Sequence, residues 1–175
     1  MNRTEPHYQK HRHETAAVSP AAFRSVCATF PSGVTVVTRL RDGRPYGMTV
    51  SSFTSVSLHP PLVLICIDKE AGFSHGLSHG LPFIVNVLSE EQQELAKRFA
   101  NRREEDRFSG VAWSAAWADV PRLEATVATV GCSVDQIVEA GDHLVLIGAV
   151  QILERHMGRP LVWCERDYHC LPRIK

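Results

Sequence analysis

A run of small hydroxyl side chains offers the clearest chemistry in this sequence. It occupies residues 47–61 and leads directly into the apolar residues 62–68. A glycine begins the run and two prolines end it, which favours a compact loop beside a buried sheet. Serine and threonine hydroxyls, with backbone N–H groups that need not close a sheet ladder, can hold a phosphate group and a polar heterocycle. The alternative is a turn whose hydroxyls hydrogen-bond to their own backbone.

Other reactive side chains form weaker patterns. His75 and His79 are four residues apart, but the glycine after each weakens a shared helix and no glutamate follows the first histidine, so we predict no metal site. No serine lies in a G-x-S-x-G motif, and the sequence has neither the dinucleotide-binding nor the P-loop glycine motif. The corner at residues 141–143, Gly-Asp-His, is by itself most simply a turn that carries an imidazole.

Length and composition are those of one globular domain with a substantial core. The 175 residues include 19 basic and 19 acidic side chains, so no net field recruits nucleic acid or an anionic membrane. The N-terminal segment has no signal-peptide core, and no run reaches the roughly 18 apolar residues that a membrane span needs. Five cysteines lack any C-x-x-C, and Cys27, Cys66 and Cys132 have apolar neighbours, which favours buried reduced thiols. We therefore expect a cytoplasmic protein.

The segments around the hydroxyl-rich run are typical of strands joined by short turns. Residues 1–18 lack apolar periodicity and are expected to form a disordered tail, which leaves 19–175 as one domain. A Ser-Pro pair opens a helix at residue 20, and its apolar stripe extends to residue 30. An Asp-Gly pair at 42–43 indicates a tight hairpin between strand 34–38 and the segment that enters the hydroxyl-rich run.

The rest of the chain adds strands and two short helices. We predict a short helix at 73–77, a strand at 82–88 and a helix at 90–100 that a Ser-x-x-Gln capping box opens. Strands at 126–134 and 144–150 are joined by a turn, and a last strand follows at 160–163. Because strands dominate and no strict βαβ alternation occurs, the pattern favours a mainly β fold, an antiparallel barrel with peripheral helices.

Taken together, these segments closely resemble the short-chain flavin reductases, the small reductase components of two-component flavin-dependent monooxygenases. The resemblance covers nearly everything between residues 23 and 171. The residues that carry it are 30–38, 47–61, 83–88, Gln92, Leu95, Phe99, Ala100, 107–108, 141–143, Gly148, 160–161 and Tyr168.

The resemblance implies a fold, an activity and partners. The implied fold is an antiparallel split β-barrel in a homodimer, with flavin bound near the subunit interface. The implied activity is that of an NAD(P)H:flavin oxidoreductase, which transfers a hydride from NADH or NADPH to FMN or FAD. The implied partner is a separate flavin-dependent monooxygenase or halogenase that receives the reduced flavin. Because the two cofactors carry the reactivity, hydride transfer needs no protein nucleophile.

The resemblance also implies a cofactor site. Flavin contacts are expected from the hydroxyl-rich run, from the end of the next strand and from the end of the helix at 90–100. They are Met48, Thr49, Val50, Ser51, Ser52, Phe53, Thr54, Cys66, Ile67, Asp68, Lys69, Phe73, Ser74, Phe99 and Ala100. Among them Ser51 and Ser52 are the expected hydroxyl contacts. His143 is expected to position the nicotinamide, with Tyr168 as a second wall.

Several alternatives stay open on the sequence alone. Asp68 and Lys69 could form a plain polar strand exit, and Phe99 could belong to the core. Residues 71–73 are less polar than is usual in the family, so FMN and FAD are not distinguished, and neither are NADH and NADPH. Since the barrel does not dictate turnover, the alternative function is a non-catalytic flavin-binding or flavin-storing protein. A third is an interaction module that uses the hydroxyl-rich run only for folding.

Overall fold

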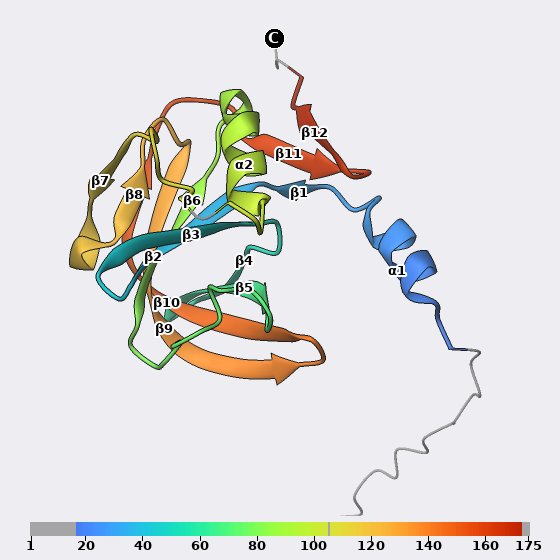
Figure 1. The fold of residues 1–175 in the computed structure, drawn as a ribbon, viewed down its shortest axis with the longest axis horizontal. Coiled ribbons are helices and arrows are strands. Elements are labelled where there is room, and N and C mark those ends of the chain that lie inside the picture. Colours follow the sequence, from blue (N-terminus) through green and yellow to red (C-terminus); the bar gives the residue numbers. More distant parts are fainter. Residues whose placement is uncertain (1–16, 105, 173–175) are drawn as a thin grey trace, which may run out of the picture.

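The computed structural model describes residues 17–104 and 106–172. The tail expected at residues 1–18 therefore lies outside the described residues, apart from its last two positions. The chain is mainly β, as predicted, and its strands form one large antiparallel sheet and two small ones (Figure 1).

The large sheet contains seven strands in the order β3-β2-β6-β9-β10-β5-β4. Their bounds are β2 (Thr35–Arg41), β3 (Arg44–Val50), β4 (Thr54–Leu58), β5 (Pro61–Asp68), β6 (Pro82–Val87), β9 (Ala128–Ala140) and β10 (His143–Arg155). Asp42 and Gly43 link β2 to β3 with φ values of 52° and 72°, which a two-residue hairpin turn requires. The predicted Asp-Gly hairpin is confirmed, and β9 and β10 extend beyond the strands predicted there.

The two small sheets contain short strands, several of which the sequence pattern did not indicate. One sheet has the order β1-β11-β12, and the other pairs β7 with β8. Their bounds are β1 (Ser32–Gly33), β7 (Trp113–Ala115), β8 (Pro121–Leu123), β11 (Leu161–Cys164) and β12 (Asp167–Cys170). Strands of three or four residues are too short to show a clear alternation of apolar and polar side chains, which is why β7, β8 and β12 were missed.

The hydroxyl-rich run is mostly strand, which corrects the prediction of a compact loop. Its first four residues complete β3, and five later ones form β4. Only residues 51–53 stay between the two strands. Because β3 and β4 are the two edges of the seven-stranded sheet, this short connection joins one edge to the other. A β-bulge interrupts the pairing of β4 with β5 between Ser55 and Ser57.

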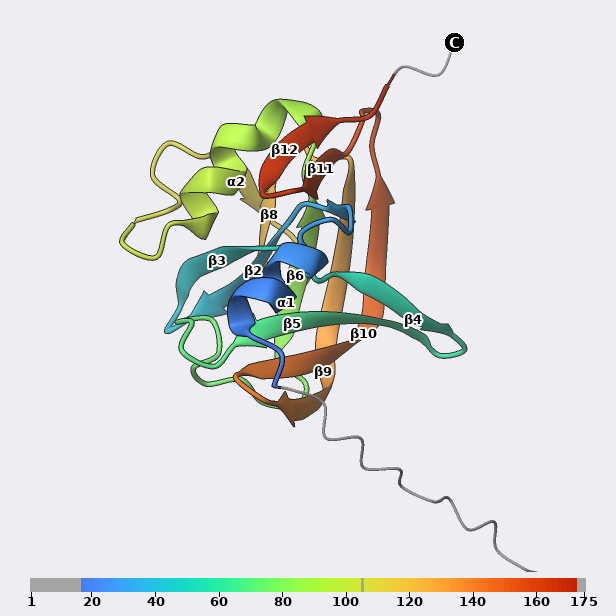
Figure 2. The same ribbon diagram turned by 90° about the vertical axis from the view of Figure 1, so that its right-hand side faces the viewer.

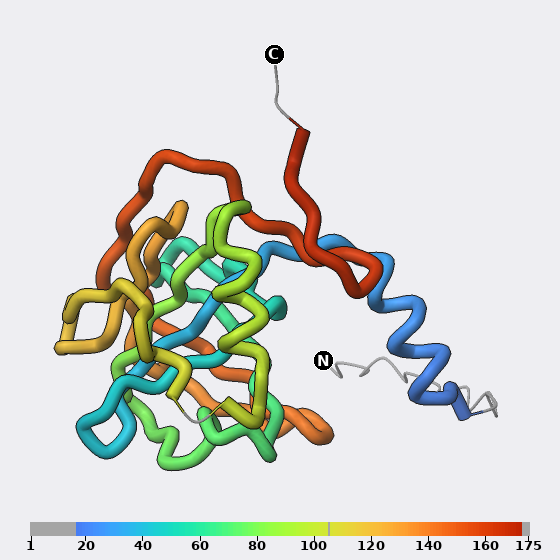
Figure 3. Tube along the Cα trace, turned by 45° about the horizontal axis from the view of Figure 1, so that its top comes forward, coloured from blue at the N-terminus to red at the C-terminus, as the bar shows by residue number. Residues whose placement is uncertain are grey.

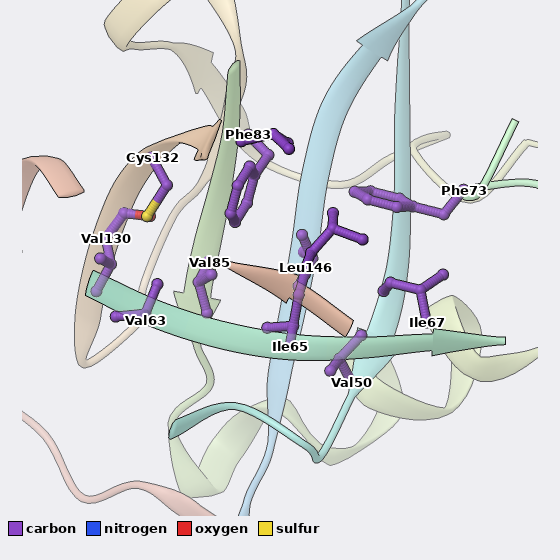
Figure 4. Close-up of a cluster of buried hydrophobic side chains, with 12 residues drawn as sticks. Val50, Val63, Ile65, Ile67, Phe73, Phe83, Val85, Val130, Cys132 and Leu146 are labelled. Carbon is purple, nitrogen blue, oxygen red and sulfur yellow. The ribbon is translucent and has the colours of Figure 1, made fainter. Parts of the chain in front are cut away.

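Two buried clusters stabilise the sheet. The larger one lies against one face of the strands and includes aliphatic side chains from six of them (Figure 4). Its members are Val37, Val50, Val63, Ile65, Ile67, Phe73, Phe83, Val85, Val130, Cys132, Val134 and Leu146. The smaller cluster packs a helix onto the sheet; its members are Val34, Val36, Leu88, Ala96, Phe99, Leu123 and Leu161. Burying one large aliphatic or aromatic side chain contributes about 1.5–3 kcal/mol.

The helix in the smaller cluster begins as predicted. A capping box joins Ser89 and Gln92, a 3-10 turn follows over Glu90–Gln92, and α2 (Gln93–Ala100) continues to the end that the sequence indicated. Phe99 of α2 packs directly on β3 at Gly47, where a Cβ atom would lie 2.8 Å from Phe99 Cε1. A glycine at residue 47 is therefore what lets α2 approach the edge of the sheet.

The short helix predicted at residues 73–77 is absent, and this segment forms consecutive turns. Gly76 and Gly80 have φ values of +72° and +79°, a left-handed conformation that a continuing helix does not permit. The turns instead bury Phe73 completely in the larger cluster. This segment therefore packs against the larger cluster through Phe73, Ala71 and Leu77.

The first helix, α1 (Pro20–Cys27), begins where predicted but ends before residue 30, and it contributes nothing to the core. Ser19 Oγ accepts a hydrogen bond of 3.1 Å from the N–H of Ala22, so the helix has the expected N-cap. None of its residues is buried, and α1 projects away from the sheet (Figures 1 and 3). Its apolar stripe is exposed to solvent, with Phe23 62% and Val26 71% exposed, and Phe30, just beyond the end of the helix, is 77% exposed.

Candidate functional site

The two edges of the seven-stranded sheet approach each other where the predicted site residues lie. β4 pairs with β5 only as far as Leu64, so the last four residues of β5 have no strand on that side. The connection between β3 and β4, residues 51–53, passes this free edge. Ser52 Oγ accepts a 2.8 Å hydrogen bond from the N–H of Cys66 and donates one of 3.1 Å to the Cys66 carbonyl. Ser52 thus connects the segment after β3 to β5 across the gap between these two strands, which we call the split. We call this pair of hydrogen bonds the Ser52 bridge.

These hydrogen bonds change the expected role of the hydroxyls. Ser52 donates its hydroxyl hydrogen to the Cys66 carbonyl, and Thr49 Oγ1 donates to the Ala96 carbonyl at 2.6 Å. For both residues, hydrogen bonding to the protein's own backbone is the correct interpretation. Ser51 is exposed. Of the two hydroxyls expected to contact a ligand, Ser51 is therefore the one that is free to do so.

Three adjacent hollows follow the split. The first, of about 470 Å³, is lined by Met48, Thr49, Phe99 and Ala100, among others. The second, of about 250 Å³, has six lining residues, which are Val34, Thr49, Ser51, Ala100, Trp163 and Tyr168. The third, of about 710 Å³, is lined by residues 51–54, Trp163 and the exposed side of α1. Since neighbouring hollows share residues, they form one groove along the β3 edge.

The groove brings together most of the side chains predicted from the hydroxyl-rich run and from α2, but not all predicted contacts. Ile67 and Phe73 are completely buried and Val50 is almost so, which means that their side chains belong to the core. Ser74 Oγ donates within its own turn, to the carbonyls of Lys69 and Ala71. From Ile67, Phe73 and Val50, only backbone groups can reach a ligand. Phe99 is buried as well, yet it still lines the first hollow.

Charged groups cluster where β5 ends beside the turn between β9 and β10. His143 is paired with Asp68 across the ladder of β10 and β5. The His143 ring donates through Nδ1 to Asp142 Oδ1 at 2.7 Å, because a carboxylate can only accept. This hydrogen bond lowers the pKa of Asp142, while the Glu70 N–H and then Arg102 lower that of Asp68. Lys69 pairs with Glu139 at 2.9 Å. Asp68 and Lys69 thus each have an ion-pair partner at the end of β5, which agrees both with a polar strand exit and with a ligand contact.

Tyr168 lies on β12, away from this group of charges. It packs on Trp163 with ring centroids 4.7 Å apart and lines the second hollow. Burial raises the pKa of its hydroxyl. The turn that carries His143 lies at the opposite end of the molecule (Figures 1 and 2). Within one chain, Tyr168 is therefore not a second wall beside His143, and that expectation is corrected.

Sequence reasoning missed part of the groove. Trp163 lies at the junction of the second and third hollows, and Arg41 and Arg102 line the first. Trp163 lies inside a predicted strand, and its cross-strand pairing with Tyr168 could have been inferred had β12 been recognised. The two arginines come from segments distant in sequence, so no local pattern could have placed them together.

The thiols differ in their surroundings. All five cysteines are free; Cys132 is buried, whereas Cys27 and Cys170 are exposed, so the expectation of a buried Cys27 was wrong. Burial raises the pKa of Cys132 to about 12, which keeps this thiol protonated at neutral pH. Among the residues that the structure describes, no group of three potential ligands is arranged to hold a metal ion. Within the same residues, no helix is long and apolar enough to cross a bilayer.

Comparisons with known proteins agree on one family. The sequence profile described as "Flavin reductase like domain" matches residues 27–172. The flavin-dependent monooxygenase reductase subunit HsaB of Mycobacterium tuberculosis is 36% identical over 157 residues, which cover 88% of this chain and 83% of that protein. The match therefore extends over nearly the whole described chain.

Two solved structures share the fold at a similar level of identity. The Streptomyces globisporus NADH:FAD oxidoreductase SgcE6, in complex with NAD and FAD fragments, is 34% identical with a TM-score of 0.83, over 90% of this chain and 98% of that one. BorF, the flavin reductase component of a bacterial two-component tryptophan halogenase, is 34% identical with a TM-score of 0.81, over 89% and 100% of the two chains.

Proposed function

The chain belongs to the family of flavin reductase-like domains, and from that premise we propose how its groove works. It is an NAD(P)H-dependent flavin reductase, a component that supplies reduced flavin to a separate monooxygenase or halogenase. The observation that carries the proposal is the groove formed by the three hollows, in which Thr49, Ser51 and Ala100 lie beside the rings of Trp163 and Tyr168.

The residues of the groove fit a flavin. Its second hollow combines the Trp163 and Tyr168 rings with small side chains, a lining suited to a flat aromatic ring system. Residues 51–53, which lie outside the ladders of β3 and β4 and line the third hollow, offer backbone donors and acceptors for the polar edge of that ring. Backbone N–H groups aimed at the edge where negative charge collects on reduction would stabilise the reduced form.

The protein's part in the reaction is positioning. A bound flavin and a nicotinamide dinucleotide would supply the hydride chemistry between them. The groove would hold the two rings face to face and exclude water from the space between them. The Ser52 bridge fixes residues 51–53, which line the groove, to β5. Nε2 of His143, the ring nitrogen left free by Asp142, would orient the nicotinamide by hydrogen-bonding its carboxamide. Because His143 lines none of the three hollows and lies far from Tyr168 within one chain, this contact would come from the second subunit of the proposed homodimer.

We extend the proposal to the assembly and its location. A homodimer is supported by the open apolar stripe on α1, which no part of the described chain covers. Because the third hollow is lined in part by α1, a partner subunit there would also help to enclose the groove. We place the enzyme in the cytoplasm, where reduced nicotinamide cofactors are available.

Absorbance at the nicotinamide band tests the proposed function. Purified protein is mixed with NADH or NADPH and with FMN, FAD or riboflavin, and oxidation is followed in each of the six combinations. We expect turnover that depends on both cofactors. A flavin-storing protein would bind flavin without oxidation above the buffer rate, and that result would refute the proposal. The ratios of kcat/KM among the six mixtures identify the preferred flavin and nicotinamide.

A further inference from the structure

Three arginine side chains converge on the first hollow of the groove. Arg41 comes from the end of β2, while Arg102 and Arg107 follow α2. We call this hollow of about 470 Å³ the arginine pocket. It also contains Thr49 and Ala100, the two residues that it shares with the aromatic hollow, so it is continuous with the place assigned to the flavin ring.

The protein holds two of these side chains in position. Arg41 donates from Nη1 to the Gly72 carbonyl at 3.2 Å, and its guanidinium lies 4.3 Å from the Tyr46 ring centre. A Cβ atom at residue 72 would lie 2.3 Å from the Tyr46 hydroxyl and 3.1 Å from Arg41 Nη1, so this arrangement needs a glycine there. Arg107 donates from Nη1 to the Gly47 carbonyl at 2.7 Å.

The positive charge of the pocket is incompletely neutralised. Among the described residues, Arg102 has a carboxylate partner, Asp68, whereas Arg41 and Arg107 bond only to carbonyls. Glu70 is the one acidic residue in the lining, and it is exposed. Arg39, two residues before Arg41 on the same strand face, adds a further guanidinium that is 2% exposed. Its Nε has no partner among the described residues, and burial, followed by repulsion from Arg41, lowers its pKa.

Such a concentration of fixed guanidinium groups costs free energy unless an anion joins it. Arginine is the residue best matched to phosphate, which it binds through two parallel hydrogen bonds. Residues 71–73, Ala-Gly-Phe, offer no side-chain hydroxyl at this position. A phosphate in this pocket would therefore be bound by the guanidinium groups.

We propose that the arginine pocket binds the phosphate group of the flavin and that Arg41 determines the preference for phosphorylated flavin. The inference rests on the proposed function, because it places the flavin ring in the adjoining hollow. The chemistry of a phosphate monoester is shared by the 2′-phosphate of NADPH, and the experiment separates the two sources.

Flavin titrations followed by fluorescence quenching test the assignment. The Kd values of riboflavin and FMN are measured for the wild type, Arg41→Gln, Arg41→Lys and the matched control Arg44→Gln. Arg44 is paired with Arg41 across the hairpin but is exposed and outside the pocket. We expect Arg41→Gln to reduce the preference for FMN over riboflavin about tenfold or more, by loss of charge-assisted hydrogen bonds. Arg41→Lys should retain part of the preference, and Arg44→Gln nearly all of it.

Two further measurements do not depend on the folding of the Arg41 variants. Inorganic phosphate should compete with FMN, but not with riboflavin, for the wild-type protein. Arg102→Gln alters a side chain that is 69% exposed and should also weaken FMN more than riboflavin. An unchanged FMN preference in both the Arg41→Gln and Arg102→Gln variants would overturn the proposal.

The remaining outcomes distinguish the two sources of phosphate, and they separate a failure of the arginine pocket from a failure of the proposed function. If Arg41→Gln raises the KM of NADPH relative to NADH while the FMN preference is unchanged, the pocket serves the nicotinamide nucleotide, and the assignment to flavin is wrong. If the wild type reduces none of FMN, FAD and riboflavin, the proposed function itself fails. A wild type that reduces riboflavin but shows no FMN preference refutes the arginine pocket alone.

Discussion

The imidazole of His143 has one nitrogen committed and one available. Nδ1 donates to Asp142, whose lowered pKa keeps that carboxylate ionised at neutral pH, so Nε2 of the neutral ring is left as an acceptor. An acceptor at that position matches the N–H₂ group of a nicotinamide carboxamide.

Replacement of His143 tests this role at the residue scale. We predict that His143→Ala raises the KM of the nicotinamide cofactor about tenfold, the value of one lost hydrogen bond, with little change in the Kd of flavin. Steady-state kinetics and a flavin titration give the two numbers. His59→Ala, in the exposed turn between β4 and β5, is the control. A larger effect on flavin binding than on the nicotinamide KM would remove His143 from this role.

At the scale of elements, the Ser52 bridge takes the place of a missing strand pair. The backbone of Cys66 would otherwise have unpaired groups at the edge of β5, and one hydroxyl satisfies both its N–H and its carbonyl. The bridge therefore keeps the end of β3 close to β5, although these two strands do not pair with each other.

Neighbouring serines allow a matched test of this element. We predict that Ser52→Ala lowers the free energy of unfolding by about 1–3 kcal/mol, since it leaves two backbone groups unsatisfied. Ser51→Ala should change it by less than about 0.5 kcal/mol, because that side chain is exposed. Urea unfolding without flavin gives both values. Equal values for the two variants would mean that the bridge does not hold the split together.

The elements differ in how far the sequence could predict them. Strong local signals, such as the Asp-Gly turn and the Ser89-Gln92 capping box, gave correct boundaries because their geometry depends only on neighbouring residues. The hydroxyl-rich run was predicted as a loop because Ser and Thr are common in turns, yet pairing with distant strands made most of it β3 and β4. The arginine pocket depends on tertiary contacts alone, so only the structure could reveal it.

At the scale of the whole molecule, α1 is unusual because it is ordered without any contact that buries it. It has eight residues, and an isolated helix shorter than about 12–15 residues is only marginally stable in water. An N-cap and a first-turn proline help, but they do not explain a row of apolar side chains facing solvent. A second copy of the chain would cover this row, which agrees with the proposed homodimer.

Charge placed on the stripe should break the dimer. We predict that the wild type has twice the 19.5 kDa chain mass in light scattering, and that the double variant Phe23→Asp with Val26→Asp shifts toward the mass of one chain. Ala21→Asp introduces a charge on the opposite side of α1 and serves as the control. A wild-type mass of one chain, or a double variant that keeps the wild-type mass, would contradict this arrangement.

The β-bulge in β4 has a consequence for the molecule in a crowded cell. β4 ends the seven-stranded sheet, and a regular edge strand of that kind could template the addition of strands from other chains. The extra residue between Ser55 and Ser57 disturbs the spacing of hydrogen-bonding groups, so a foreign strand would find no continuous row to join. The same irregularity therefore protects the protein against aggregation at high concentration.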